Sequence, residues 1–199
     1  RLLSETSLRD QLGGSFDNWK AQGRLRGEIE LDIGLKSRQV KPRVQALMSD
    51  LVLSPGDFGL KITELEGQLQ FDEGILSARQ LRGQVFDKAI QANIETGDSG
   101  VITRIQGRSD IAAIRDWLQQ PVLGFAEGET DWSMRVVAGR GQSYVHLESD
   151  LKGVLFDLPE PLFKPADLSS KLWMSMPLAA GEQRLELNIE RVGHLSLLL

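Results

Sequence analysis

Leu65-Glu66-Gly67-Gln68-Leu69-Gln70-Phe71 places leucine, glycine or phenylalanine at every second position and a polar residue between them. A β-strand sends alternate side chains to opposite faces, so this stretch predicts a strand with one apolar and one polar face. The phrase Leu-x-Gly-x-apolar recurs at residues 25–29, 81–85 and 151–155. A glycine on an apolar face leaves a gap that another group can fill. The repetition predicts one sheet unit that is used several times.

The same alternation extends along most of the chain. Turn signals such as Asp72-Glu73-Gly74 and Gly97-Asp98-Ser99-Gly100 separate the alternating segments, which predicts an antiparallel meander. The apolar phase slips in residues 44–53, and a β-bulge near Ser49-Asp50 explains the slip. The expected strands are residues 23–36, 44–53, 65–71, 76–85, 89–95, 101–107, 129–137, 143–151, 168–176, 184–191 and 194–199.

Two segments depart from this rhythm. Ser109-Asp110 is a helix-capping pair, and the next apolar residues, among them Ile114 and Trp117, share one helical stripe before Pro121. This pattern predicts a helical insertion at about 109–120. A proline-rich connection occupies about 157–167. A further short helix and turn are expected in residues 1–22.

The predicted helix is too small for the predicted sheet. About ten strands at ~4.8 Å spacing give an apolar face ~45 Å wide, whereas a helix of ~10 residues is ~15 Å long. The uncovered face must close into a barrel, pack against a second sheet, or remain open to something apolar. The residues alone leave these three solutions open.

Composition excludes several classes of function. The 199 residues carry a net charge of −5, with lysines and arginines scattered among acids, which argues against nucleic-acid binding. There is no cysteine, so thiolate zinc sites are excluded. No apolar run reaches the ~20 residues that cross a bilayer. Because the chain begins at Arg1 and ends within an expected strand, we interpret residues 1–199 as one internal β segment of a longer protein.

No constellation of catalytic residues is visible. His146 and His194 are the two histidines, and neither has neighbours that indicate catalysis or metal binding. The acids at Glu64/Glu66 and Glu127/Glu129/Asp131 repeat with period two, which is typical of a solvated strand face. The sequence predicts no enzyme, cofactor or metal. The enzyme alternative, a hydrolase with paired carboxylates, would need these acids to converge in a pocket.

Two stretches resemble a known family. Residues 149–166 contain Ser-x-Leu-x-Gly followed by Leu158-Pro159-Glu160-Pro161-Leu162-Phe163-Lys164, which is similar to Leu-Pro-x-Pro-Leu-x-Lys in YhdP-type members of the AsmA-like superfamily, relatives of TamB. Residues 65–71 and 76–86 are also similar. Where that family often has Phe-Gly and Pro-Ile, this chain has Phe86-Asp87 and Ala89-Ile90.

The resemblance implies a periplasmic protein, anchored in the inner membrane of a Gram-negative bacterium, that moves phospholipid towards the outer membrane. It implies a mainly β fold: a long antiparallel, strongly twisted and curved sheet that forms an apolar groove, with one or two short helices. The expected partners are phospholipid acyl chains, and the membrane through a preceding part of the parent. The alternative is a closed β-sandwich module without a ligand. Residues in shared phase predict a concave lining of Leu25, Ile29, Leu31, Ile33, Leu65, Leu69, Phe71, Leu81, Val85, Trp132, Met134 and Val136.

Overall fold

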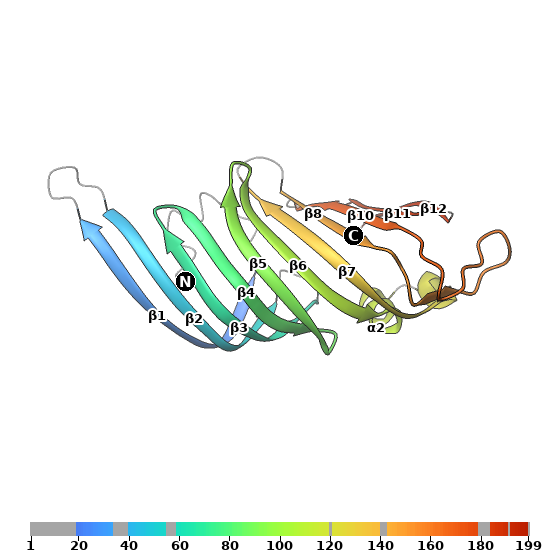
Figure 1. Ribbon diagram of the computed structural model, residues 1–199, viewed down its shortest axis with the longest axis horizontal. Coiled ribbons are helices and arrows are strands. Elements are labelled where there is room, and N and C mark those ends of the chain that lie inside the picture. The colour runs from blue at the N-terminus through green and yellow to red at the C-terminus, as the bar shows by residue number, and fades with distance from the viewer. Residues whose placement is uncertain are drawn as a thin grey trace.

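A single antiparallel sheet dominates the computed structural model (Figure 1). The structure describes residues 19–33, 40–54, 59–119, 121–139, 143–178, 184–190 and 192–198. The helix expected within residues 1–22 therefore lies almost wholly outside the described residues. The elements are β1 (Lys20–Ile33), β2 (Val40–Ser54), β3 (Ile62–Asp72), β4 (Ile75–Val85), β5 (Lys88–Gly97), β6 (Gly100–Asp110), α2 (Ile111–Leu118), the 3-10 helix η1 (Pro121–Phe125), β7 (Ala126–Ala138), β8 (Tyr144–Ser149), β9 (Val154–Phe156), β10 (Leu172–Pro177), β11 (Arg184–Ile189) and β12 (Gly193–Leu198).

The strands lie in sequence order, each antiparallel to the next, except that β9 leaves the path and pairs with β7. The short turns between alternating segments make this meander the simplest solution. Figure 1 shows long strands that bend along their length within a twisted sheet. In the described residues β1 and β12 form opposite edges of one open sheet, so the closed sandwich or barrel does not form.

The bulge expected near Ser49-Asp50 is confirmed. The register of β2 against β3 shifts between Met48 and Leu51, and Asp50 has a left-handed φ of 54°. A second shift separates Ala78 from Leu81 in β4, where Gln80 has a φ of 55°. A bulge inserts one residue and so restores the inward phase of the apolar residues that follow.

The glycine of the repeated phrase makes room for a neighbouring side chain in the middle of the sheet. A Cβ added at Gly67 would lie 2.5 Å from Leu81 Cδ2, and Gly67 has a φ of +138°. Leu81 therefore fills the gap that the sequence leaves on β3. The copies of the phrase on β3 and β4 therefore pack against each other, because the glycine of one copy leaves room for the leucine of the other.

Helix α2 covers only one end of the sheet. The Asp110 side chain accepts a hydrogen bond of 2.8 Å from the Ala112 amide, as its predicted capping role requires. The helix ends at Leu118, and Gln119 takes the left-handed conformation beyond it. The helix contacts β6, β7 and η1, and the Trp117 ring lies 5.8 Å from the Phe86 ring.

The fourth copy of the phrase, residues 151–155, does not form the strand unit that the repetition predicts, and the strand expected at residues 143–151 ends at Ser149. Residues 151–153 form a turn, and only Val154–Phe156 is extended, as β9. The cause is Lys164, which is 4% exposed and whose Nζ donates to the carbonyl oxygens of Leu151 (2.8 Å), Val154 (2.7 Å) and Pro165 (3.3 Å). Burial lowers the pKa of Lys164, partly offset by Asp150 and Asp167. This buried ammonium ties the proline-rich connection to the turn.

Candidate functional site

The strand register assigns almost all of the predicted lining residues to one face. Residues directly opposite one another on antiparallel strands project to the same side. The chain of pairs runs from Ile29 through Val44 to Phe71, and from Ile105 to Met134. Eleven of the twelve predicted residues share this side, which we call the apolar face. The twelfth, Ile33, lies opposite Val40 in the register, and its side chain falls outside the described part.

One row of side chains crosses most of the apolar face without a polar group. Each member lies directly opposite the next, across β4, β5, β6, β7, β8, β10 and β11. Six inter-strand steps of ~4.8 Å make the row ~29 Å long. The central row, as we name it, consists of Leu81, Ala92, Ile105, Met134, Leu147, Met174 and Leu187.

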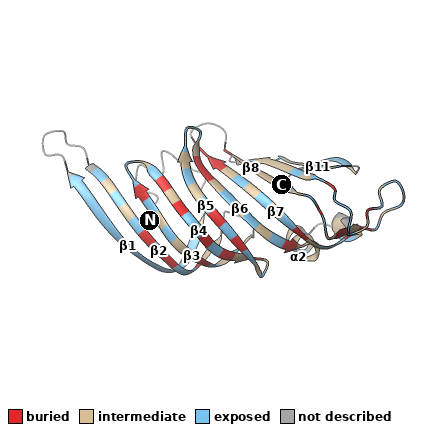
Figure 2. Ribbon diagram, viewed as in Figure 1, coloured by how far each residue is buried: buried red, intermediate tan, exposed pale blue. Residues whose placement is uncertain are grey.

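Burial differs strongly along the apolar face, as Figure 2 shows. Leu25, Ile29 and Leu31 on the edge strand β1 are 53%, 54% and 57% exposed. In contrast, Leu65 and Leu81 in the middle are 8% and 4% exposed. The middle residues form clusters whose members all come from this one face of β2 to β7. Side chains of one face bury one another in this way where the sheet curves towards that face. Further along, the central row is half-buried from Ile105 onwards.

Trp132, which the sequence left undecided between core and groove, forms part of the floor of the apolar face. A Cβ at Gly107 would lie 2.9 Å from Cζ2 of Trp132, so the indole lies against this glycine. Its Nε1 donates a 2.9 Å hydrogen bond to the Ser109 hydroxyl, which is 2% exposed. The only polar atom of the indole side chain is thereby satisfied, and the ring presents an apolar surface.

The opposite face, the polar face, carries ion pairs between strands. Arg43 contacts Glu30 at 3.2 Å and Asp72 at 3.1 Å. Glu129 contacts Arg108 on this face at 3.2 Å. Lys88, which lies opposite Val85 at the start of β5, also reaches Glu129 at 2.6 Å, and its hydrogen bond and charge hold the pKa of Glu129 below its usual value. A lowered carboxylate pKa favours a permanently ionised partner in an ion pair rather than a general acid.

Of the five carboxylates that the hydrolase alternative would use, three have hydrogen-bond or ion-pair partners: Glu64, Glu129 and Asp131. Besides the ion-paired Glu129, Glu64 accepts a 2.6 Å hydrogen bond from the Gln84 amide. Within the ranges that the structure describes, no group of three or more histidine, cysteine, aspartate or glutamate residues could hold a metal ion. His194 contacts Glu186 at 2.6 Å, and His146 stacks against Trp173 with ring centroids 5.4 Å apart.

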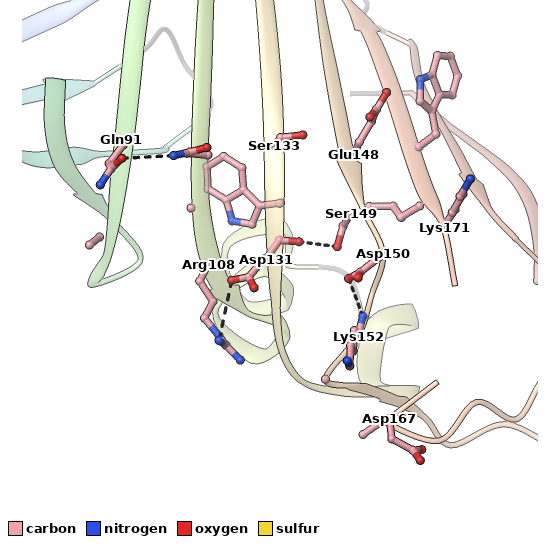
Figure 3. A pocket seen from close by; sticks show the side chains of 18 residues that line it. Gln91, Arg108, Asp131, Ser133, Glu148, Ser149, Asp150, Lys152, Asp167 and Lys171 are labelled. Atoms are coloured by element: carbon pink, nitrogen blue, oxygen red, sulfur yellow. Dashed lines mark hydrogen bonds and ion pairs between the residues drawn. The ribbon is translucent and has the colours of Figure 1, made fainter. Parts of the chain in front are cut away.

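A hollow of about 1370 Å³ lies mainly on the polar face, not on the predicted apolar lining. It spans β5 to β10 and reaches the turn after β8 (Figure 3). Three cations and four carboxylates line it, so its charges nearly balance. These residues are Arg108, Lys152, Lys171, Asp131, Glu148, Asp150 and Asp167.

Comparison with known proteins decides the family. The chain matches the model of the YhdP protein family over residues 1–196. The chain belongs to the YhdP family. It is 28% identical over 175 residues to the "Intermembrane phospholipid transporter YhdP" of Escherichia coli (strain K12), a match that covers 82% of this chain and 14% of that YhdP protein. No solved structure gives a significant match. Among the described residues of this YhdP-family chain, no helix has the length and apolarity to cross a membrane.

Two residues of interest escaped the sequence reasoning. Lys164 was noted only as part of a motif, because its carbonyl partners become neighbours only in the folded chain. Trp173 lies opposite Glu148 and is 43% exposed on the polar face. The alternation of β10 indicates the position of Trp173. Leu172 and Met174 take the apolar positions, so Trp173 projects to the other face.

Proposed function

We propose that this chain is a non-enzymatic segment of a periplasmic lipid conduit, in which phospholipid acyl chains lie against the apolar face. The observation that carries the proposal is the central row, an uncharged band across seven strands of an open sheet. The family membership and the printed function of the Escherichia coli relative support it.

An acyl chain has no hydrogen-bonding groups, so it needs continuous apolar surface rather than a shaped polar pocket. The central row, ~29 Å long at ~4.8 Å per strand, exceeds the ~15 Å hydrocarbon thickness of one leaflet of a bilayer. From Ile105 to Leu187 its side chains are half-buried, so part of their surface is accessible. A sheet that is open on this side can accept a chain without unfolding.

The polar face is suited to water. Its ion pairs, such as Arg43 with Glu30 and Asp72, join exposed side chains across strands. Lipid carried on one face and water on the other would let a single sheet extend through an aqueous compartment. In this proposal the parent protein is anchored in the inner membrane by a part outside this chain.

Site-specific photo-crosslinking in cells tests the proposal. A photoreactive residue at Leu31 or Leu69 on the apolar face should capture phospholipid. Glu30 and Gln68 are the matched controls, because each is the sequence neighbour of a test position and projects to the polar face. They should capture little or none, since a solvated face offers no apolar surface.

Equal capture on both faces, or none on either, would contradict the conduit. Normal accumulation of each variant, followed by immunoblotting, separates loss of lipid contact from loss of folding. Replacing Ile105 with Asp should obstruct passage, because an unpaired charge beside hydrocarbon is costly. The same change at Gln106, the adjacent exposed residue, should be tolerated.

A further inference from the structure

We propose that the polar face binds an extended, uncharged glycan chain of N-acetylhexosamine sugars, with Trp173 as the stacking platform. Trp173 and the polar groups beside it line the hollow of about 1370 Å³. This inference rests on the proposed function. In a periplasmic conduit, the polar face would be exposed to the glycan network that lies between the two bacterial membranes.

The Trp173 indole is exposed, and neighbouring rings fix its orientation. Trp173 is 43% exposed and stacks on the His146 ring, with ring centroids 5.4 Å apart and an angle of 30° between the ring planes. His146 in turn lies 4.6 Å from the Tyr144 ring. One side of the indole is thus fixed by a stack of rings, while the residue borders the hollow. An ordered, exposed tryptophan loses little conformational entropy when a ligand stacks on it.

Hydrogen-bonding groups extend from the indole in a straight line across the sheet. Trp173 lies opposite Glu148, which lies opposite Ser133, followed by Gln106 and Gln91. Four steps between strands make this polar row ~19 Å long. Gln106 donates a 3.3 Å hydrogen bond to Gln91. Within the described residues, no ion pair or side-chain hydrogen bond occupies the Glu148 carboxylate or the Ser133 hydroxyl. Figure 3 shows Ser133, Glu148 and Gln91 along the hollow.

This chemistry favours a sugar over other ligands. The apolar side of a pyranose ring packs on an indole face, while its hydroxyl and acetamido groups pair with carboxylate, hydroxyl and amide groups. The nearly balanced charges of the hollow favour neither a polyanion nor a polycation. The linear polar row suits an extended chain of repeating units rather than a compact ligand.

Isothermal titration of the purified chain with chitopentaose, a soluble pentamer of N-acetylglucosamine, tests the proposal. We expect saturable binding that weakens at least tenfold in Trp173→Ala and severalfold in Glu148→Gln. Trp173→Phe, which keeps a flat ring, should retain most of the affinity. Leu47→Ala is the matched control, because Leu47 is an exposed apolar residue on the same face, at β2.

Absence of saturable binding, or equal affinity in wild type and Trp173→Ala, would overturn the glycan site. A polar face that instead docks a peptide would give no heat with the pentamer and would overturn it as well. Circular dichroism of each variant confirms that the exposed substitutions leave the sheet folded. Lipid crosslinking at Leu31 and Leu69 does not involve Trp173, so failure of the glycan site and failure of the conduit are distinguishable.

Discussion

Two strands with the same phrase behave differently in this molecule. Residues 25–29 on β1 and residues 81–85 on β4 both read Leu-Arg-Gly-x-apolar. Leu25 is 53% exposed, whereas Leu81 is 4% exposed. Within the described residues, strand β4 has a neighbour on each side, while β1 pairs with β2 alone. The phrase therefore specifies which face a residue occupies, and neighbouring strands determine how deeply it is buried.

The largest expected effect is the difference in stability between variants in the middle and at the edge of the apolar face. Leu81→Ala removes a buried side chain that fills the space beside Gly67, and should lower the free energy of unfolding by about 2–5 kcal/mol. Ile29→Ala, on the exposed edge strand, should cost about 1 kcal/mol or less. Urea denaturation of both variants measures the difference. Equal costs would mean that the edge and the middle of the apolar face are packed alike.

The fourth copy of the phrase differs from both, because a turn held by Lys164 interrupts it before β9. Lys164→Met keeps most of the apolar stem of the side chain but leaves buried carbonyl oxygens unpaired, which should cost about 1–3 kcal/mol. The exposed Lys152 provides the control, and Lys152→Met should change stability by about 0.5 kcal/mol or less. An unaltered unfolding midpoint in Lys164→Met would show that the ammonium does not hold this turn.

The smallest expected effect concerns Lys88, which lies opposite Val85 at the end of the third copy and pairs with Glu129. Lys88 lowers the pKa of Glu129 in the folded state, so the pair stabilises the fold above the ordinary carboxylate pKa of 4.5. This stabilisation is lost as the pH falls through the lowered folded pKa. Lys88→Gln should therefore be slightly less stable than wild type at pH 7 and nearly equal to it at pH 2–3, by thermal unfolding. A difference that grows at low pH would contradict the pairing.

The sequence predicted much of the local structure. Alternation gave the strands, a phase slip gave the bulge at Asp50, and a capping aspartate gave the start of α2. These features depend on neighbours in the chain, which a sequence displays. Strand β9 and the burial of Lys164 depend on contacts between distant segments, so the repeated phrase wrongly indicated one sheet unit at residues 151–155, where a turn precedes β9.

For the candidate site, periodicity identified the face but not its shape. The shared phase of Leu65, Leu69 and Phe71 follows from period two, and register carries it across the sheet. Whether ten or more strands close or stay open depends on cumulative twist and curvature, which no single strand encodes. The same limit hid the hollow beside Trp173, because its lining comes from several strands.

Fluorescence quenching by phospholipids with brominated acyl chains tests the central claim most directly. One variant keeps only Trp132, on the apolar face, and a second keeps only Trp173, on the polar face, with the other tryptophans replaced by phenylalanine. Bromine quenches an indole only at close contact, so the lipid should quench Trp132 strongly and Trp173 little. Equal quenching of the two tryptophans, or no quenching of Trp132, would contradict the assignment of acyl chains to the apolar face.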